Sequence, residues 1–350
     1  MKVDVIIVGS GISGCCAAWK LFLQGKTCKI ITDRSFSSSS VAAGVYNPTI
    51  LKRFTSVWKG AEQMDEAIPF YKNIEAILQK KLLHPIHVLR RFHDEKEMKT
   101  WIKKSEKEEL TRFMNNEVIS NLQINGIDAP FGYGEVRETG WLDTNSFMKH
   151  TMEFFSQKGC VLKEMFEHDI LIAKSNEVYY KELIADHIVF VEGFRMKKNP
   201  FFHHLPMQGN KGEVLTIKVP DLKLDYIIKS AVFLMPYRDD LFWVGATYNR
   251  EDLTYSPTAG GLDFLTSRLD RFLKLPYDII DHKAGIRPTT IDRRPFVGNY
   301  NEKPSIWCFN GMGSRAVLVA PWAAHQLYNT IFEGVDLLNE IDIKRFDKGS

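Results

Sequence analysis

Three glycines near the N-terminus have the spacing that binds the phosphates of a dinucleotide. A nearly continuous apolar run from Val3 leads into the motif Gly9-Ser-Gly11-Ile-Ser-Gly14. In this motif the first glycine allows a tight turn, the second lets the backbone approach a pyrophosphate, and the third lets the next helix pack on the strand. The helix predicted from here to about Gln24 points its positive N-terminus at the anion. The motif therefore predicts a strand, a turn and a helix that bind a nucleotide.

An acidic residue completes this unit. Cys28 to Thr32 is predicted to be a second apolar strand, and Asp33 follows it about 20 residues after Gly14, where a carboxylate binds ribose hydroxyls. A glycine-rich turn can be merely structural, but strand, helix and acid together favour nucleotide binding. Arg34 comes directly after the acid. An arginine here could bind the 2′-phosphate of NADP, so NADP stays open as the nucleotide. The other interpretation is that Arg34 is a solvated loop residue.

A segment of small residues follows the second strand and suits contact with a flat ring system. Residues 37–48 have the sequence SSSSVAAGVYNP. Small side chains let the backbone run close to a ligand, although a flexible serine-rich linker has the same composition. The Ala-Ala-Gly at 42–44, followed by Pro48, resembles the second FAD-contacting loop of the D-amino-acid oxidase (DAO) superfamily.

The resemblance to this family continues to the C-terminal part of the chain. GIRP at 285–288 and GMGSRA at 311–316 resemble the glycine-oxidase pattern, and KGEVL at 211–215 is similar to a strand that re-enters the substrate domain. A second nucleotide site at Gly311 is excluded, because too few residues follow it for a full βαβ unit. In the family this turn directs a helix N-terminus at the N1/C2 edge of the flavin, where reduction places negative charge.

The same resemblance assigns a substrate anchor. Arg287 occupies the place of the glycine-oxidase arginine that binds the substrate carboxylate, and a planar fork of donors suits that role. A structural arginine paired with Asp292 or another acid is the alternative. The catalytic set implied is Arg287 with Tyr248 and Tyr46, and Arg315 is a further candidate for support.

The residues expected to hold FAD come from stretches far apart in the sequence. They are Gly9, Gly11, Ser13, Gly14, Asp33, Arg34, Ser40, Ala42, Ala43, Gly44, Val161, Gly193, Arg287, Gly311, Met312, Gly313, Ser314, Arg315 and Ala316. Some amine-oxidising relatives attach FAD through a cysteine near the position of 285–288. None of the five cysteines of this chain lies there, so the FAD is expected to be non-covalent. The cysteines and histidines lack the spacing of a zinc site, and no metal is expected.

The expected fold class is α/β. The resemblance implies a Rossmann-like FAD-binding domain of the DAO, or glutathione-reductase-2, type, formed by residues 1–82, 145–205 and 282–350. Residues 83–144 and 206–281 are expected to form a second, mixed α+β substrate domain rich in antiparallel strands. The sequence from Met235 to Thr247 predicts a hairpin, which is expected to form the floor of the substrate pocket. Asp94 to Met114 predicts a solvated helix, and Ile341 to Phe346 resembles the closing strand-to-tail segment of the family.

Composition and charge limit the class of protein. The chain has 350 residues, 44% hydrophobic and 25% charged, which fits two packed globular domains and excludes a disordered or coiled-coil chain. A net charge of +3 is mild for a dedicated nucleic-acid binder. The apolar runs are shorter than the roughly 18 residues of a membrane span. The absence of a signal-peptide pattern and the odd number of cysteines favour a reduced, cytoplasmic protein.

The resemblance implies an FAD-dependent oxidoreductase that oxidises the C–N bond of a small amine or amino acid by hydride transfer to flavin. Two alternatives stay open. GMGSRA at 311–316, with Ala320-Pro321, also resembles the FAD domain of the bifunctional enzyme that modifies the carboxymethylaminomethyl group of tRNA wobble uridine. That activity would need RNA as partner, and the methyltransferase half of that enzyme is not in this sequence. The third possibility is an FAD-binding subunit of a larger dehydrogenase.

Aromatic residues in the predicted hairpin bear on the electron acceptor. Sarcosine-oxidase-like members of the family have a lysine beside the flavin for oxygen activation, and Trp243 or Phe242 stands at that point here. We therefore expect slow peroxide formation and faster turnover with artificial acceptors. Phe233 stands where D-amino-acid oxidases have a tyrosine that contacts the carboxylate, so one supporting hydroxyl is missing.

Overall fold

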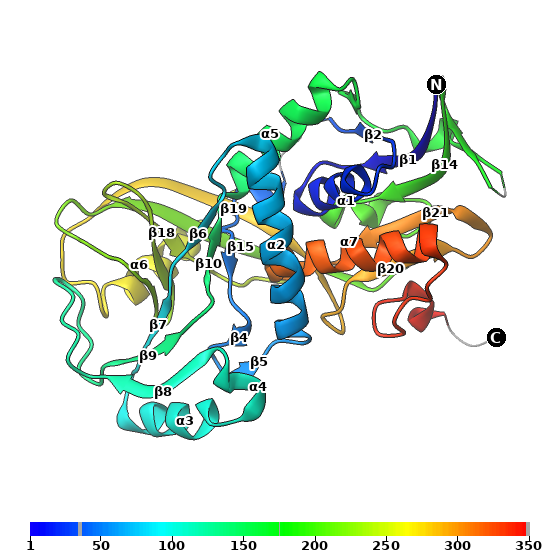
Figure 1. Ribbon diagram of the computed structural model, residues 1–350. Helices are drawn as coiled ribbons and strands as arrows, with labels where there is room; N and C mark the ends of the chain where they lie inside the picture. The colour runs from blue at the N-terminus through cyan, green and yellow to red at the C-terminus, as the bar shows by residue number, and fades with distance from the viewer. Residues whose placement is uncertain (34–36, 175, 348–350) are drawn as a thin grey trace.

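A mostly parallel sheet holds the glycine turn at its edge. The computed structural model describes residues 1–33, 37–174 and 176–347 (Figure 1). The strand order is β11 (Val161–Leu162), β2 (Cys28–Ile31), β1 (Lys2–Val8), β14 (Leu183–Phe190), β13 (Val178–Tyr180) and β12 (Ile172–Ala173). β21 (Lys303–Asn310) also pairs with β14 and carries β20 (Phe296–Tyr300) on its other side. Because β11, β2, β1, β14 and β21 are parallel, their carboxyl ends share one edge.

Both faces of this sheet are covered. The consecutive residues Val5, Ile6 and Ile7 have no exposed surface, as expected for a parallel strand packed on both sides. One face packs against α1 (Ile12–Leu23), which contacts α5 (Thr144–Gln157) and α7 (Ala316–Glu333), and α7 in turn contacts α2 (Gly60–Leu78) (Figure 1). Ile6 points to the other face, where a second apolar cluster includes Phe202.

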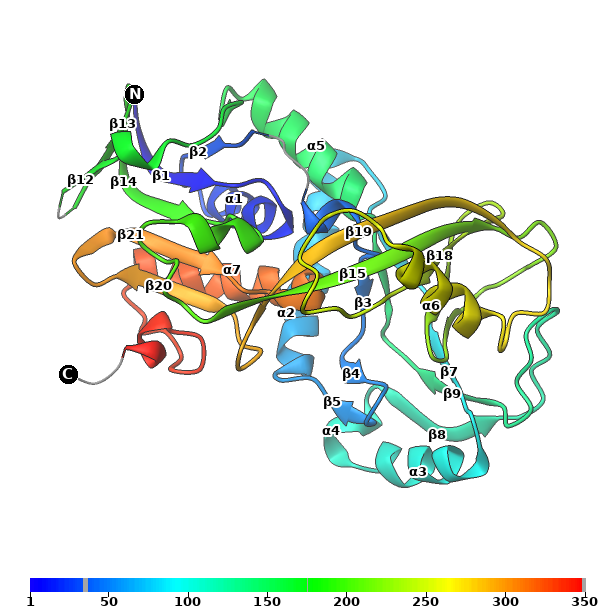
Figure 2. The same ribbon diagram turned by 180° about the vertical axis from the view of Figure 1, so that it is seen from behind.

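A second sheet of eight strands faces the glycine-turn side of the first sheet. Its order is β19 (Asp278–Thr290), β15 (Met207–Lys218), β18 (Leu241–Gly245), β17 (Phe233–Arg238), β16 (Ile227–Lys229), β7 (Val88–Arg91), β9 (Tyr133–Val136) and β8 (Met114–Ile119). All pairings are antiparallel except β16 with β7. The long strands β15 and β19 run side by side at one edge of this sheet and reach toward the parallel sheet (Figure 2).

Short elements join the two sheets. β10 (Gly140–Leu142) pairs with β3 (Val45–Tyr46) and β6 (Leu83–Pro85), and β4 (Thr49–Ile50) forms a small hairpin with β5 (Thr55–Ser56). The outer helices are α3 (Glu95–Ser105), α4 (Glu108–Thr111) and α6 (Ala259–Leu269). Single turns of 3-10 helix lie at η1 (Ser38–Ser40), η2 (His168–Ile170), η3 (Gly193–Lys198), η4 (Gly313–Arg315) and η5 (Ile343–Phe346).

The expected α/β class with a second mixed sheet is confirmed, and so are the strand, turn and helix at the N-terminus and the hairpin at 235–247. Ile341 to Phe346 is not a strand. Asp342 accepts a hydrogen bond from the Lys344 amide at 2.9 Å, which begins a helical turn, and only an isolated bridge joins Asp342 to Val297. The helix predicted over 94–114 is divided into α3 and α4 before β8 begins. β19 crosses the predicted boundary at residue 282, and the division into domains stays a prediction.

In the part of the chain that is described, no helix is both long enough and apolar enough to span a lipid bilayer.

Candidate functional site

A cavity of about 800 Å³ lies between the two sheets. Its walls come from the β1–α1 turn, the segment after β2, the turn after β14, the start of α7 and the inner face of the second sheet. The first four of these segments follow the carboxyl ends of β1, β2, β14 and β21, at one edge of the parallel sheet. Ligands of open α/β sheets bind at this kind of edge.

The glycine turn brings the backbone to the cavity wall. Gly9 has a φ of +117°, and a β-carbon on it would lie 2.5 Å from the carbonyl oxygen of Val191. A β-carbon on Gly14 would lie 2.2 Å from the carbonyl oxygen of Gly9, so α1 packs closely on the turn. The Ile12 amide, at the start of α1, donates to Ser39 Oγ at 3.2 Å. Amides and helix dipole together form a site for an anion.

Asp33 is held at the cavity wall by an ion pair. Arg195 Nη1 in η3 donates to Asp33 Oδ2 at 2.7 Å, and Nη2 donates to Oδ1 at 3.2 Å. Both residues line the cavity. Arg34, the residue that bears on NADP, lies outside the described residues.

The segment of small residues lies beside the start of α5. Gly44 has a φ of +73°, and a β-carbon there would lie 1.9 Å from the carbonyl oxygen of Leu142 in β10. Thr144 Oγ1 donates to the Ser39 carbonyl at 3.0 Å. These contacts hold residues 42–44 as a flat wall of the cavity, and their small side chains leave its volume open.

Asn310 joins the C-terminal glycine turn to the turn after β14. Its Nδ2 donates to the Gly193 carbonyl at 3.0 Å, while its Oδ1 accepts from the Gly311 amide at 2.8 Å. Gly311 and Gly313 have φ values of +75° and +60°, which turn the chain into η4 and α7. The sequence analysis did not assign Asn310, although its place directly before the glycine turn was a usable signal.

Arg287 points from β19 into the cavity. A β-carbon on Gly212 would lie 1.9 Å from Arg287 Nη2, so the guanidinium lies directly over this glycine. Arg287 Nη1 donates to Asn210 Oδ1 at 3.3 Å and to the Thr247 carbonyl at 3.2 Å. The Tyr248 ring covers it, with its centroid 4.5 Å from the guanidinium carbon. Desolvation by burial lowers the pKa of Arg287.

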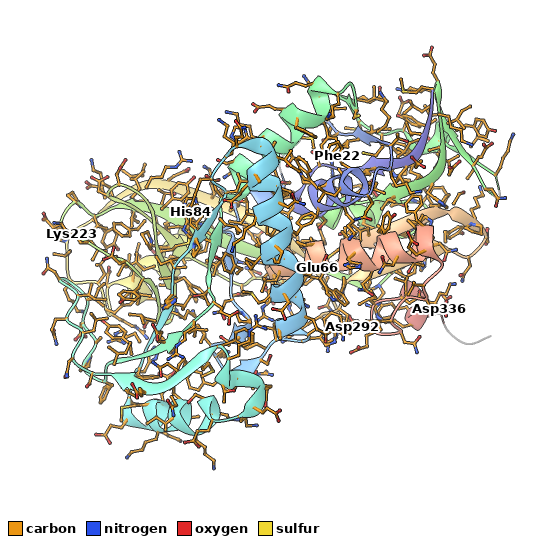
Figure 3. All side chains as sticks on the ribbon, in the orientation of Figure 1. Phe22, Glu66, His84, Lys223, Asp292 and Asp336 are labelled. Atoms are coloured by element: carbon orange, nitrogen blue, oxygen red, sulfur yellow. The ribbon has the colours of Figure 1, made fainter. Side chains whose placement is uncertain are left out.

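Asp292 is not the partner of Arg287. It lies by the C-terminal segment (Figure 3), and its Oδ2 accepts from Arg345 Nε at 2.7 Å. The alternative in which Arg287 pairs with Asp292 is therefore wrong. The contacts of Arg287 are to neutral acceptors and a ring, which leaves its charge uncompensated by them.

The two tyrosines of the expected catalytic set are placed differently. Tyr248 lines the cavity and is 69% exposed. Tyr46 is buried in β3, and its hydroxyl lies against Gly140, where a β-carbon would be 2.3 Å from it. Arg315 lines the cavity at the start of α7, and desolvation by burial lowers its pKa.

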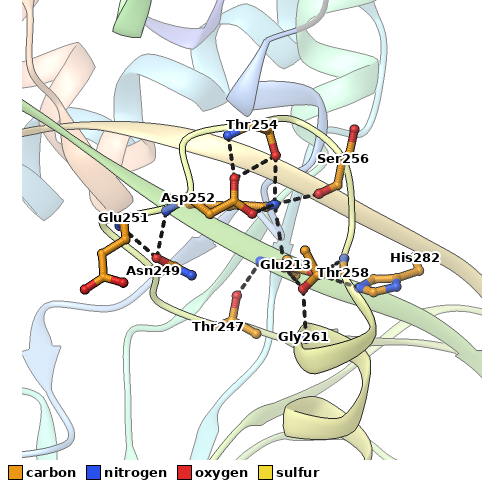
Figure 4. Close-up of polar contacts among 11 residues, drawn as sticks. Glu213, Thr247, Asn249, Glu251, Asp252, Thr254, Ser256, Thr258, Gly261 and His282 are labelled. Atoms are coloured by element: carbon orange, nitrogen blue, oxygen red, sulfur yellow. Dashed lines mark hydrogen bonds and ion pairs between the residues drawn. The ribbon is translucent and has the colours of Figure 1, made fainter.

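A buried polar network holds the loop that carries Tyr248 (Figure 4). Lys211 is completely buried and donates to Asp252, to Thr254 Oγ1 at 3.1 Å and to the Ser256 carbonyl at 2.6 Å. Next to it, Glu213 accepts from the Thr258 amide and hydroxyl, both at 2.8 Å. The loop at 247–258 is thereby fixed to β15.

Aromatic side chains form the floor of the cavity. The Trp243 indole lies over Gly245, where a β-carbon would be 2.4 Å from the ring. Its Nε1 is buried and has no hydrogen-bond partner among the described residues. Trp243 and Phe233 line the cavity, whereas Phe242 belongs to the apolar core of the second sheet. Of the two candidates for the lysine position of sarcosine oxidases, Trp243 is the one that faces the cavity.

Lys229, at the end of β16, is a cavity residue that the sequence analysis missed. It is half-buried, its Nζ donates to the Ala231 carbonyl at 3.1 Å, and the ammonium lies 4.5 Å from the centroid of the Phe233 ring. Desolvation, with a smaller effect of the Arg90 charge, lowers the pKa of Lys229 to about 7. Its local sequence gives no signal, because the burial comes from strands distant in the chain.

The structure brings most of the predicted site residues together at the cavity wall. These are Gly9, Gly11, Ser13, Asp33, Ala42, Ala43, Gly44, Gly193, Tyr248, Arg287, Met312, Gly313, Ser314, Arg315 and Ala316. Five predicted residues lie outside the described wall, namely Gly14, Ser40, Tyr46, Val161 and Gly311. Gly14 and Gly311 act on the backbone next to the wall, as their close contacts show.

The cavity fits a dinucleotide with a flat ring system. It offers a glycine cradle at a helix N-terminus, a wall of small residues, a second helix N-terminus and a buried indole N–H that lacks a partner in the described structure. The family match agrees with this geometry. The model of the FAD dependent oxidoreductase family, DAO, matches residues 4–329, and the chain belongs to this family.

The individual relatives are distant. The chain is 23% identical over 318 residues to the tRNA 5-methylaminomethyl-2-thiouridine biosynthesis bifunctional protein MnmC of Campylobacter jejuni subsp. doylei, covering 85% of this chain and 46% of the relative. It is 26% identical over 172 residues to the glycine oxidase of Bacillus subtilis, covering 45% of this chain and 46% of that protein. The chain thus matches about half the length of these curated relatives.

Solved structures share the fold over nearly the whole chain. Glycine oxidase from Bacillus cereus superposes with a TM-score of 0.80 at 17% identity and covers 95% of this chain and 96% of its own. Glycine oxidase from Geobacillus kaustophilus gives a TM-score of 0.81 at 16% identity, covering 96% and 95%. The DAO fold of the chain therefore agrees with its membership of the FAD dependent oxidoreductase family.

Proposed function

We propose that this protein oxidises the C–N bond of a small amino acid, or of an amine that carries a carboxylate. The observation that carries the proposal is Arg287, whose cavity-facing guanidinium contacts only neutral groups among the described residues. A charge enclosed by protein without a counter-charge favours an anionic ligand. A carboxylate matches the planar fork of donors.

Non-covalent FAD would be held by residues on this wall. The turn at 9–14 and the start of α1 suit the pyrophosphate, Asp33 suits the ribose, and residues 42–44 suit the ring system. When bound, FAD supplies the acceptor for a hydride from the carbon that bears the nitrogen; the product imine is then hydrolysed by water. The backbone amides and helix dipole at the start of α7 suit the negative charge that reduction places on the ring.

The other wall residues orient the substrate. Arg287 binds the carboxylate, and Tyr248 covers the guanidinium and limits its contact with water. The aromatic floor of Trp243 and Phe233 excludes water from the reacting carbon. Positioning of this kind, rather than a protonating side chain, is the main requirement for hydride transfer.

The test is anaerobic mixing of the purified yellow protein with a panel of amino acids and amines while the flavin absorbance is followed. The proposal expects bleaching by at least one carboxylate-bearing amine and none by the same amine with its carboxylate amidated. Equal bleaching by both forms would contradict it.

A second candidate function has an observation in its favour. A groove adjoins the cavity and is lined by Lys52, Arg53, His93, Lys96 and Thr100, together with the acids Asp94 and Glu97; Lys52 and His93 also belong to the cavity wall. A further groove continues along α3, where Lys96, Lys99, Lys103 and Lys104 outnumber the one acid, Glu95. Such a basic track suits a phosphate backbone that presents a carboxymethylaminomethyl group to the cavity.

Binding of RNA separates the two candidates. The second one expects binding of a tRNA whose affinity falls steeply with salt and whose salt slope decreases in the variant Lys96→Gln/Lys103→Gln. RNA binding that is absent at low salt, or unchanged by these substitutions, would contradict it.

A further inference from the structure

A row of residues that crosses the second sheet includes the cation Lys229. In the strand register, Val214 in β15 lies opposite Gly245 in β18, Gly245 lies opposite Phe233 in β17, and Phe233 lies opposite Lys229 in β16. Residues directly opposite each other on neighbouring strands share a face of the sheet. All four line the cavity, so the Lys229 side chain belongs to the same wall as the substrate floor.

Among the described residues, no carboxylate forms an ion pair or hydrogen bond with Lys229. Its ammonium contacts the Ala231 carbonyl and the face of the Phe233 ring, and among the described residues the charge that perturbs it is the cation Arg90. Arg90 lies opposite Lys229 in the neighbouring strand β7. An enclosed ammonium with a cationic neighbour is unfavourable unless an anion comes to it.

The carboxylate that binds the neighbouring Arg90 is already engaged. Glu97 in α3 binds Arg90, and its Oε2 accepts from the His93 amide at 2.8 Å. Arg90 is further fixed by its bond to the Ser230 carbonyl at 2.8 Å. Arg90 also lines the cavity, but Glu97 balances its charge, whereas Lys229 has no carboxylate partner among the described residues.

Lys229 is too far from Arg287 to bind the same carboxylate. The Arg287 guanidinium lies over Gly212 in β15, and β16 is three strands further along the sheet, about 14 Å at the usual spacing of strands. The Trp243 indole, over Gly245 in β18, lies between them in this order. The two cations mark two separate regions of one cavity.

We propose that Lys229 is a second anion subsite of this cavity, and that the substrate is an extended amino acid or amine whose far end carries a second anionic group, a carboxylate or a phosphate. The inference rests on the proposed function, in which Arg287 holds the first carboxylate. The second subsite makes binding selective for length and charge. Short amino acids with one carboxylate leave the Lys229 charge unbalanced, so they bind more weakly than an extended ligand with two anionic groups.

The experiment is isothermal titration calorimetry of the holoprotein at slightly acidic pH, which measures binding without turnover. The ligands are the α,ω-dicarboxylates from succinate to sebacate, the monocarboxylates of matching length, and the matching carboxylates with a terminal phosphonate. We expect one chain length at which a second anion strengthens binding at least tenfold over the monocarboxylate, the usual effect of a charge-assisted hydrogen bond. The terminal group that gives the larger gain in affinity, carboxylate or phosphonate, identifies the kind of anion that binds at Lys229.

Variants decide whether Lys229 is the cause. Lys229→Met keeps an unbranched side chain and should remove the gain without changing the affinity for monocarboxylates, and Lys229→Arg should restore part of it. Lys223→Met is the matched control, because Lys223 is exposed and lies at the far end of the second sheet, away from the cavity (Figure 3). A gain that is absent at every length, or that persists in Lys229→Met, would overturn the proposal.

Failure of the proposed function gives a different result. In that case Arg287→Met leaves the affinity for monocarboxylates unchanged, whatever Lys229→Met does to the second anion.

Discussion

The guanidinium of Arg287 occupies the space above Gly212, at a position where any β-carbon on residue 212 would lie 1.9 Å from Nη2. Gly212→Ala must therefore displace the guanidinium, although it changes no polar group. We expect this variant to raise KM for a carboxylate substrate at least tenfold while kcat falls less. Gly260→Ala is the control, since nothing lies within 4 Å of a β-carbon there, and its kinetics should match the wild type. A wild-type KM in Gly212→Ala would refute the assignment of Arg287 as the residue that binds the carboxylate.

Removal of the anchor itself should have a larger effect. Arg287→Met deletes charge-assisted hydrogen bonds of about 1.5 to 3 kcal/mol, a weakening of roughly tenfold or more. Steady-state kinetics should show a strongly raised KM with near-normal FAD content. Arg271→Met, at an exposed residue after α6, is the control. Parallel loss of FAD and of folded protein would instead identify Arg287 as structural.

The flavin should leave the protein on acid precipitation. None of the five cysteines lines the cavity: Cys15, Cys16, Cys28 and Cys308 are buried elsewhere, and Cys160 lies next to β11. Burial also raises the pKa of the Cys308 thiol, so this side chain stays in its protonated, unreactive form. After precipitation and centrifugation the yellow colour should be in the supernatant. Colour that stays in the washed pellet would show a covalent bond.

Oxygen should be a poor electron acceptor. Trp243, not a lysine, faces the cavity from β18, so a fixed cation that assists electron transfer to oxygen is missing at that point. With a good substrate, we expect oxygen uptake to be much slower than reduction of a dye such as dichlorophenolindophenol. An oxygen electrode and a dye assay on the same enzyme sample give the comparison, and fast oxygen uptake would count against this prediction.

The stability of the protein should depend on pH through Lys229. Its pKa in the folded protein is lowered to about 7 from the ordinary 10.5. Between these values the unfolded chain binds more protons, so the free energy of unfolding rises with pH. Lys229→Met removes this contribution, which is at most about 1.4 kcal/mol per pH unit. The variant should therefore be more stable than the wild type below pH 7, and the difference should vanish toward pH 10.5.

Urea unfolding of both proteins over this pH range gives the measurement. Arg90, His93 and Lys52 face the same end of the cavity and are present in both proteins, so the difference between the two proteins reports the change at Lys229. Lys223→Met should give a flat difference, because that side chain is exposed. A flat difference for Lys229→Met as well would show that its ammonium is not desolvated.

The sequence was most informative where structure is local. The glycine turn, the strand before it and α1 follow from glycine spacing and hydrophobic pattern within about 30 residues. Arg287 and the start of α7 were found through family resemblance, and their relation to the cavity agrees with it. Lys229 was missed because β16 becomes an inner strand only by pairing with β7, which precedes it by more than a hundred residues. The 3-10 turn at 343–346 was missed because the Asp342 side chain competes with strand pairing.

The paired strands β15 and β19 have a consequence for how the cavity opens. They are joined from Met207–Thr290 to Lys218–Asp278 with one irregularity, and they form one edge of the second sheet. A pair of long antiparallel strands resists hinge bending, because bending would break the hydrogen bonds between the strands. We therefore expect any opening of the cavity to involve the wall segment that carries Tyr248 and Tyr255, which the buried Lys211 fixes through its hydrogen bonds to Asp252 and Ser256.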